Sequence, residues 1–334
     1  MAEAGDSHWF EVPLGTTCDG STVFERLSEV PALLVTGTTG SGKSSFVKTL
    51  ATELMVGQGP KELRFAIFDS SRVSYACLQY APYMFCPITR DTWEFERLMR
   101  LIASESERRL ILKDRMDKAG LGHLFVIVDD FAAACPSDET VAAVERCLQN
   151  ARLTQIHFVF VTSTPTSRVL TPSLLSNIDR RISFRVTSRA ESKRVLGCTD
   201  ASKLGIPGEM IVRRVSSCVQ CSAAHLDDEK ILEASLELAK KYEEVESPLI
   251  TDIDYGGQAT AGADHECGLD PLIDEAARVV IEIRLGSTSG LQRRLKISYR
   301  RAVRLMDMLE EKGIVGPQNG SRPRDVLVDS LDGH

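Results

Sequence analysis

Short apolar runs separated by amphipathic stretches fill most of the first 245 residues. Six of these runs predict buried strands: residues 31–36, 63–69, 124–130, 157–162, 182–186 and 210–213. Helical periodicity marks longer stretches between them, at residues 43–55, 92–115 and 141–153. Short aliphatic strands that alternate with helices indicate an α/β fold, in which helices cover both faces of a parallel sheet.

The pattern changes after residue 245. Residues 246–268 contain Gly, Ala, Thr and Asp with little periodicity, which predicts a flexible linker. Residues 269–330 then hold three helical segments and two short apolar runs: 271–285, 288–295, 298–312, 314–315 and 326–328. Gly313 stands where a helix C-cap glycine is expected. Three helices followed by a β-hairpin predict a small winged helix-turn-helix domain.

A glycine-rich loop joins the first of these strands to the first helix. It fits the phosphate-binding pattern G-x-x-x-x-G-K-[ST]. Glycines let backbone N–H groups converge on phosphate oxygens, and the helix N-terminus adds partial positive charge. We therefore expect Lys43 to bind the β- and γ-phosphates of ATP, and Ser44 to bind Mg²⁺. The full set of expected nucleotide-binding residues is Gly37, Thr38, Thr39, Gly40, Ser41, Gly42, Lys43, Ser44 and Ser45.

Two carboxylates end the third predicted strand. Residues 125–130 read FVIVDD, about 85 residues after the glycine-rich loop. Asp129 is the candidate for holding Mg²⁺ through water, and Asp130 is the candidate for orienting or deprotonating the attacking water. Many sheet strands end in aspartate, so ordinary strand-end acids are the alternative. The doubled acid and its spacing favour the catalytic interpretation.

Together these segments resemble the FtsK/SpoIIIE family of DNA translocases. The matching blocks occur in family order, at residues 13–23, 32–44, 126–132, 156–165, 177–186 and 208–210. Residues 270–328 resemble the DNA-reading winged-helix domain of that family. The resemblance implies a RecA-like P-loop ATPase motor over residues 1–245. Such a motor assembles as a homo-hexamer and moves double-stranded DNA at the expense of ATP.

The resemblance also implies that an arginine of one subunit completes the ATP site of the next. Arg181 is the best positional match, with Arg180 beside it; a surface arginine in an ion pair is the alternative. Two positions depart from the family, because Asp130 replaces a glutamate and Ser163 replaces a glutamine. Aspartate reaches about 1–1.5 Å less far, and a misplacement of this size can cost ~100-fold in rate. We therefore expect slow hydrolysis, or hydrolysis that needs DNA and neighbouring subunits.

A basic run lies in the predicted winged helix. Residues 292–304 (QRRLKISYRRAVR) contain no acid and six basic residues: Arg293, Arg294, Lys296, Arg300, Arg301 and Arg304. On the predicted recognition helix, Arg300 and Arg304 share one face, which Asp307 continues. Arginine binds guanine edges and carboxylates accept from cytosine, whereas the first three basic residues are expected on phosphates. A solvated basic face or a protein-docking surface is the alternative.

The bulk composition agrees with a cytoplasmic globular protein. The net charge is −7 and 43% of residues are hydrophobic, so a DNA-binding surface must be local. Nine irregularly spaced cysteines, and an N-terminus without a signal-peptide pattern, favour reduced thiols. We expect neither a membrane span nor the membrane-anchored N-terminal region that the family usually carries. The Cys218-x-x-Cys221-x-x-x-His225 stretch lacks a fourth ligand, so we do not expect zinc.

The sequence thus predicts an ATP-dependent DNA translocase with sequence-oriented binding by its C-terminal domain, which serves chromosome or mobile-element DNA transfer or segregation. The alternative is an ATP-gated DNA-binding regulator with weak or no hydrolysis, which Asp130 and Ser163 keep open. A protein-secretion ATPase of the same superfamily is a third hypothesis. The winged helix argues against it, because a secretion motor needs no reader of duplex DNA.

Overall fold

The chain divides into two compact units, Met1–Gly257 and Gln258–His334. Each has an apolar core of its own. The computed structural model describes residues 10–71, 73–113, 121–135, 137–205, 207–214, 217–245, 247–250, 272–283, 286, 291, 294–295, 302, 305–306, 308–310, 312–316, 324 and 326–328.

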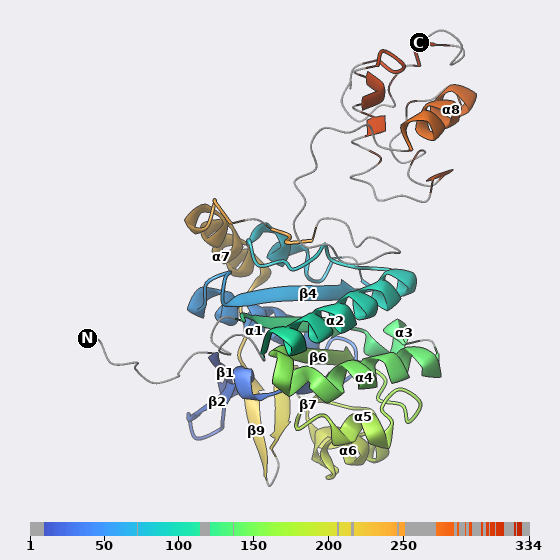
Figure 1. Ribbon diagram of the computed structural model, residues 1–334. Coiled ribbons are helices and arrows are strands. Elements are labelled where there is room, and N and C mark those ends of the chain that lie inside the picture. The colour runs from blue at the N-terminus through green and yellow to red at the C-terminus, as the bar shows by residue number, and fades with distance from the viewer. Residues whose placement is uncertain are drawn as a thin grey trace. The chain divides into compact units, whose positions relative to one another are not determined.

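The first unit is built on a nine-stranded sheet of order β2-β1-β9-β8-β7-β3-β6-β5-β4 (Figure 1). Strands β7, β3, β6, β5 and β4 are parallel neighbours, which confirms the expected parallel sheet. Strands β8, β9, β1 and β2 extend it in antiparallel fashion. The strands are β1 (Glu11–Thr16), β2 (Thr22–Arg26), β3 (Ala32–Thr36), β4 (Leu63–Asp69), β5 (His123–Asp129), β6 (Ile156–Thr162), β7 (Arg180–Phe184), β8 (Glu209–Arg213) and β9 (Cys218–Ala223).

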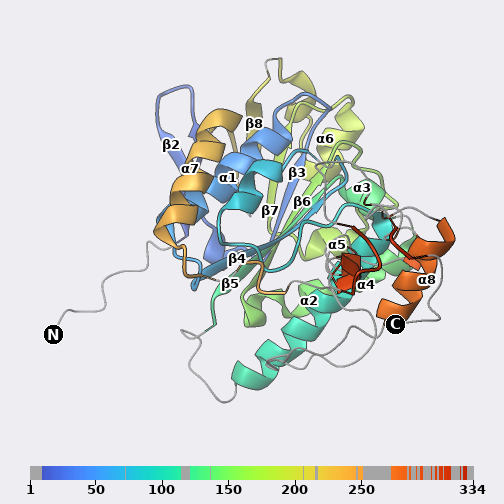
Figure 2. The same cartoon turned by 90° about the horizontal axis from the view of Figure 1, so that it is seen from above.

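Helices cover both faces of this sheet (Figure 1, Figure 2). Helices α1 (Lys43–Gly57) and α7 (Asp228–Lys241) lie on one face. Helices α2 (Thr92–Lys113) and α4 (Asp138–Thr154) pack together on the other. Shorter helical segments complete the unit: η1 (Leu27–Glu29), η2 (Ala76–Tyr80), α3 (Phe131–Ala134), α5 (Pro172–Ser176), α6 (Arg189–Leu196) and η4 (Asp200–Lys203).

The central strand β3 shows why the sheet is buried on both sides. Leu33 and Val35 belong to the core under α1, whereas Ala32 and Leu34 belong to the core under α2 and α4. Side chains of a strand alternate between faces, so an unbroken apolar run supplies both cores. Each buried Leu or Val contributes about 1.5–3 kcal/mol relative to an exposed one. Because β3 is packed on both faces, its ends are held in position, and so are the loops that leave them. The candidate site lies at these loops.

The element bounds differ slightly from those predicted. Helix α4 begins at Asp138 rather than 141, because Ser137 caps it by accepting a hydrogen bond from the Thr140 N–H. Strand β7 covers Arg180–Phe184 instead of 182–186. Strand β9 and helix α7 were not predicted at all. The sequence assigned residues 247–250 to the linker, yet the Leu249 and Ile250 N–H groups donate to carbonyls of the first unit. The predicted domain boundaries themselves stay predictions.

The described part of the second unit agrees with a winged helix. Helix α8 (Ile273–Ile283) packs on a core that includes Leu291, Ala302 and Leu309. The helical segment through Leu309 ends at Gly313 (φ 69°): the Gly313 N–H donates to the Glu310 carbonyl, and the next N–H donates to that of Leu309. These are the two bonds of a Schellman motif, so the expected C-cap is confirmed. An antiparallel bridge pairs Val315 with Val326, in the two runs predicted as the hairpin.

Candidate nucleotide site

The glycine-rich loop lies at the carboxyl edge of the parallel strands. It leaves β3 after Thr36 and enters α1 at Lys43, whose N-cap is Gly42. Strand β6 lies between β3 and β5, so the ends of all three strands meet at this edge. Ligands of open α/β sheets bind outside these carboxyl ends.

Two glycines hold backbone conformations that the loop needs. Gly37 has φ 151°, and a Cβ added there would lie 2.6 Å from the Phe184 Cβ and 2.7 Å from the Ser41 Oγ. Gly42 has φ 106° as it turns the chain into α1. Side chains are strained in this region of φ. These two glycines therefore let the loop turn tightly from β3 into α1.

Lys43 is a buried cation in this loop. The residue is only 7% exposed, and its Nζ donates to the Thr38 carbonyl at 2.8 Å. Burial lowers the pKa of Lys43, and the charges of Asp129 and Asp130 oppose that shift. A buried ammonium is costly unless it is paired, and a phosphate would pair with it. Thr38 thus holds the lysine at the mouth of the loop.

Ser44 and Asp129 meet across the site. The Ser44 hydroxyl donates to the Asp129 Oδ2 at 3.0 Å. Burial raises the pKa of Asp129, while hydrogen bonds from Ser44 and from the Asp130 N–H lower it. One hydroxyl and one carboxylate at the phosphate loop form an oxygen donor set of the kind Mg²⁺ uses together with substrate phosphates. The residues present therefore fit Mg²⁺.

Asp130 and Ser163 stand at the same edge of the sheet. Asp130 follows β5, is exposed, and adopts the left-handed conformation (φ 56°, ψ 56°) as the N-cap of α3. Its N–H donates to the Asp129 Oδ1 at 2.9 Å. Ser163 follows β6 directly and is also exposed. Both predicted catalytic positions thus face solvent beside the loop.

The remaining loop residues differ in their surroundings. The Thr38 N–H donates to the Arg185 carbonyl at 2.7 Å, so it is already bonded within the chain. Thr39 and Gly40 are exposed, and Ser45 is half-buried. The Ser41 Oγ is buried and has no hydrogen-bond partner among the described residues. An orphaned polar atom inside a phosphate loop is consistent with a polar ligand there.

Arg181 is not brought to this site by the fold. It lies on β7, where its guanidinium donates to three carbonyls of the same chain, those of Leu175, Ile178 and Val195. Arg180 forms an ion pair with Glu25, at 3.0 Å between Nε and Oε2. Both arginines therefore have partners within the chain. A role for either in the site of a neighbouring subunit stays a prediction.

Sequence reasoning missed two residues at the site, Asp69 and Tyr75. Asp69 ends β4, is the register partner of Asp129 on β5, and is 1% exposed. Tyr75 is fully buried next to Asp129. The aspartate had a signal, because the run at residues 63–69 ends in an acid just as β5 does. Tyr75 had none, since only the path of the loop brings it here.

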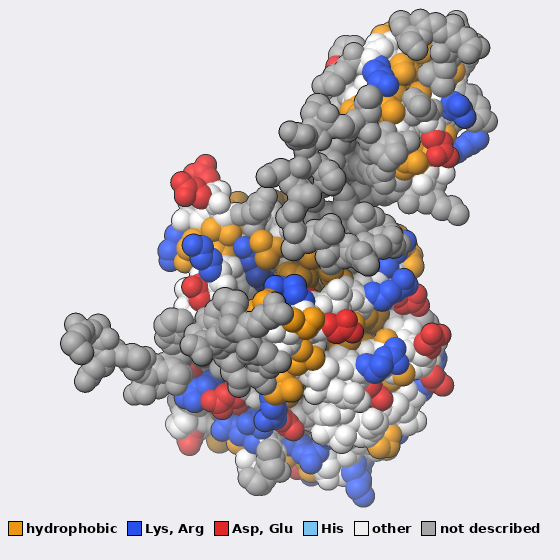
Figure 3. Space-filling model, viewed as in Figure 1, with side chains coloured by type: hydrophobic (Ala, Val, Ile, Leu, Met, Phe, Trp, Pro, Cys, Tyr) orange, Lys and Arg blue, Asp and Glu red, His pale blue; other side chains and the backbone are white. Residues whose placement is uncertain are grey.

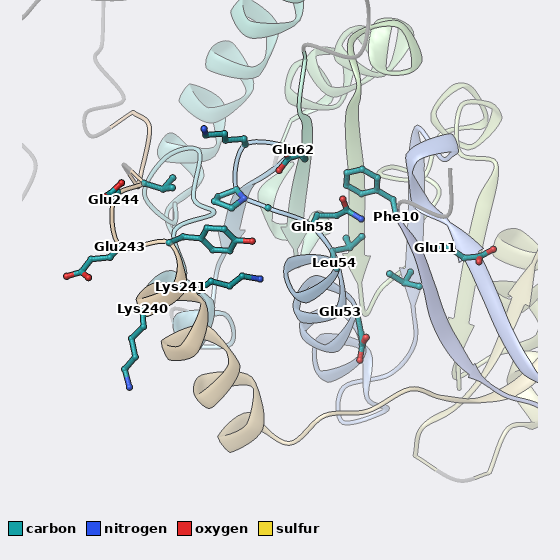
Figure 4. A pocket seen from close by; sticks show the side chains of 17 residues that line it. Phe10, Glu11, Glu53, Leu54, Gln58, Glu62, Lys240, Lys241, Glu243 and Glu244 are labelled. Atoms are coloured by element: carbon teal, nitrogen blue, oxygen red, sulfur yellow. The ribbon is translucent and has the colours of Figure 1, made fainter. Parts of the chain in front are cut away.

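A cavity of about 1090 Å³ lies at the opposite end of α1, away from this site (Figure 4). Phe10, Glu53 and Gln58 line it together with Lys240 and Lys241 from the end of α7, and none of the predicted nucleotide-binding residues does. Acidic and basic side chains both line it, and they form no group directed at one common point. We assign it no role.

Charged side chains of both signs are interspersed over the face that carries α2 and α4 (Figure 3). Exposed residues of α2 alternate in sign, as Glu96, Arg100, Glu107 and Arg108 do. The exposed face of α2 is thus an ordinary solvated helix surface.

The predicted DNA-reading residues belong to the second unit. Of these, Arg294 is described and is exposed. The others lie outside the described residues: Arg293, Lys296, Arg300, Arg301, Arg304 and Asp307. Within the part of the chain that the structure covers, no group of three or more His, Cys, Asp and Glu side chains is placed to hold a metal ion. Among those same residues, no helix is long and apolar enough to cross a bilayer.

Solved structures confirm the fold. The conjugation coupling protein TcpA of pCW3, solved as a monomer with ATPγS, superposes with a TM-score of 0.60 at 22% identity, over 70% of this chain and 71% of that one. The cytoplasmic domain of the type VII secretion ATPase EccC from Thermomonospora curvata gives 0.62 at 20% identity, over 74% and 33%. The predicted P-loop ATPase architecture is therefore correct.

Sequence comparisons cover nearly the whole chain. DNA translocase FtsK of Tropheryma whipplei is 30% identical over 98% of this chain and 47% of its own length. DNA translocase SpoIIIE of Bacillus subtilis is 31% identical over 95% and 43%. The chain thus spans less than half the length of these curated relatives. The model of the FtsK/SpoIIIE family matches residues 3–214, and that of the FtsK gamma domain matches residues 268–329. The chain therefore belongs to the FtsK/SpoIIIE family.

Proposed function

We propose that this chain is an ATP-dependent translocase of double-stranded DNA. The observation that carries the proposal is the buried Lys43 beside the bonded Ser44–Asp129 pair, at the carboxyl edge of the parallel sheet. The family membership of both units supports it, because the matched relatives are named DNA translocases. ATP hydrolysis would supply the energy and the second unit would contact the duplex.

Each residue at the site has a role in this proposal. Lys43 and the loop N–H groups would bind the β- and γ-phosphates. Ser44 and Asp129 would hold Mg²⁺, which would neutralise charge on the phosphates when bound. Asp130 would accept a proton from the attacking water. As the water oxygen bonds to the γ-phosphorus, the bond from that phosphorus to the bridging oxygen breaks, and ADP and phosphate are released.

We further propose that the active form is a homo-hexamer, in which a neighbouring subunit contributes a cation to each site. The resemblance of residues 177–186 to the family supports Arg181 as that cation. Arg181 would then have to exchange its three carbonyl partners for phosphate oxygens. Such an exchange would make hydrolysis depend on assembly, which agrees with the short reach of Asp130 and Ser163.

The proposal is tested by steady-state ATP hydrolysis with and without long duplex DNA, with Lys43→Ala as the blank. A motor gives hydrolysis that duplex DNA stimulates severalfold and that the blank lacks. Triplex displacement on the same duplex then shows whether the stimulated protein moves along DNA. Nucleotide binding with no hydrolysis above the blank would overturn the motor.

A second function is favoured by one observation. Asp130 and Ser163 are both exposed and both shorter than the residues of the family at those positions. An ATP-gated DNA-binding regulator would bind nucleotide through the intact loop and hydrolyse it slowly. It would bind DNA with different affinity in the presence of ATPγS and of ADP, but would displace no triplex.

A further inference from the structure

The loop after β4 is organised around the Asp69 carboxylate. Its Oδ1 accepts from the Ser71 N–H at 3.1 Å and from the Ser71 hydroxyl at 2.6 Å, and its Oδ2 accepts from the Tyr75 N–H at 3.2 Å. Asp69 in turn is the register partner of Asp129 on the neighbouring strand β5. A buried carboxylate with three donors holds its loop in one conformation. Tyr75 is thereby placed at the carboxyl edge of the sheet.

The Tyr75 hydroxyl lies close to Asp129 and Ser44, but in a geometry that completes no hydrogen bond with either. The side chain is fully buried, and its hydroxyl lies beside the Asp129 carboxylate and the Ser44 hydroxyl. It nevertheless has no hydrogen-bond partner among the residues that the structure describes. A buried hydroxyl without a partner destabilises the folded state, because it has lost its hydrogen bonds to water. Phenylalanine would fill the same space without that cost, so the hydroxyl needs an explanation.

Tyr83 provides the comparison. It is also fully buried on the same side of the sheet. Its hydroxyl is within hydrogen-bond distance of two carbonyl oxygens, that of Met55 at 2.9 Å and that of Gln58 at 2.7 Å. Its hydroxyl therefore stabilises the fold in the ordinary way. The Tyr75 hydroxyl has no such carbonyl partners and lies beside the proposed nucleotide site.

We propose that Tyr75 is a positioning residue of the nucleotide site, whose hydroxyl donates to the Asp129 carboxylate when MgATP is bound. The inference rests on the nucleotide site of the proposed function. Asp129 already accepts from Ser44 at one oxygen and from the Asp130 N–H at the other, and a carboxylate has about four acceptor positions. A third donor would fix the rotation of the carboxylate. Outer hydrogen bonds of this kind commonly change metal affinity or activity 10- to 100-fold.

The test compares Tyr75→Phe with Tyr83→Phe in the full chain. The Kd of ATPγS is measured with Mg²⁺ and with EDTA, and Tm is measured without nucleotide. Mg²⁺ lowers the Kd of ATPγS by some factor relative to EDTA, and we expect this factor to be about tenfold smaller in Tyr75→Phe. The Kd in EDTA should be unchanged, and Tm should be unchanged or raised. Tyr83→Phe should do the opposite, lowering Tm and keeping the full effect of Mg²⁺.

Other outcomes would overturn the inference. If Tyr75→Phe keeps the full effect of Mg²⁺, or lowers the Tm of the nucleotide-free protein, the hydroxyl is structural. If Mg²⁺ adds no affinity even in the unmodified chain, Asp129 does not hold the metal and has nothing to be positioned for. The proposed motor fails separately, by a lack of DNA-stimulated hydrolysis while the effect of Mg²⁺ on binding remains.

Discussion

Asp130 combines an unusual backbone with a proposed chemical role. Its left-handed conformation costs most L-residues roughly 1–2 kcal/mol, but aspartate and asparagine visit it routinely. A glutamate here would reach further and would carry that strain. The shorter acid is therefore compatible with the turn that leads from β5 into α3. The side chain is exposed, so water reaches it freely.

We predict that Asp130→Asn lowers kcat for ATP by about 10²–10⁴-fold, because the amide cannot accept the proton of the attacking water. ATP affinity should stay within about twofold, since asparagine keeps the backbone conformation and the N–H bond to Asp129. Steady-state kinetics and ATPγS binding measure the two effects. Asp138→Asn, at an exposed acid in the first turn of α4, is the matched control and should leave kcat unchanged. If Asp130→Asn and its control have equal kcat, Asp130 is not the general base.

Single residues show how far sequence reasoning reached at the site. Lys43, Ser44 and Asp129 were predicted to act together, and the fold brings them together, because the loop motif and the strand-end acid fix local backbone geometry. Tyr75 was not predicted, since its place depends on how the Asp69 carboxylate folds the loop. Arg181 was predicted from resemblance, which carries no information about its partners within the chain.

The elements were predictable to the degree that their apolar pattern was continuous. Strands β3 to β6 are wholly or nearly wholly buried, and their sequences are apolar runs that are interrupted internally at Arg64 and His157 alone. Strand β9 has mostly small and polar residues, with only Cys221 fully buried, and it left no such run. Helix α7 is amphipathic, but exposed Leu232 and Leu236 weaken its pattern. Contacts with the rest of the fold, rather than local sequence, place these two elements.

The starts of β5 and β6 hold a pair of histidines. His157 Nδ1 is 2.8 Å from the Val30 carbonyl, which can only accept, so this nitrogen carries the proton. His123 Nδ1 then donates to the His157 Nε2, at 2.8 Å. Burial lowers the pKa of His123 to about 4, and the charge of Arg109 adds to the shift. Burial, together with His123, lowers the pKa of His157 to about 3.

This pair makes the stability of the first unit depend on pH. The unfolded histidines take up protons below about pH 6.5, while the folded ones stay neutral to about pH 4 and pH 3. Their stabilising contribution is therefore complete above pH 6.5 and is lost as the pH falls. Each histidine lowers the free energy of unfolding by up to about 1.4 kcal/mol per pH unit in this window. Urea unfolding at pH 7.0, 6.0 and 5.0 measures the slope.

We expect His123→Phe to halve the histidine contribution to this slope, because one of the two neutral rings is removed. Phenylalanine keeps a planar ring in contact with Phe10, whose ring centroid lies 4.3 Å from that of His123. His225→Gln, at an exposed histidine before α7, should retain the full slope. An unchanged slope in His123→Phe would show that other groups cause the acid sensitivity.

At the scale of the whole molecule, charge is divided unevenly along the chain. The net charge is −7, yet residues 292–304 carry six basic side chains and no acid. In the proposed function, the first unit would bind nucleotide and the second unit would contact DNA. Nonspecific attraction to phosphates should then depend on the second unit.

That division predicts how DNA binding responds to salt. An exposed side chain in contact with one phosphate contributes about 0.9 to the slope of log Kd against log salt concentration. Arg294 is exposed, so Arg294→Ala should lower this slope by about one and weaken binding equally for unrelated duplexes. Lys312→Ala removes the same charge from an exposed position beyond the basic run, and should leave the slope unchanged. Fluorescence anisotropy at salt concentrations between about 50 and 300 mM measures the slope for each variant. Equal slopes for the two variants would mean that the second unit attracts DNA by its general charge, and that the run at residues 292–304 is a solvated face.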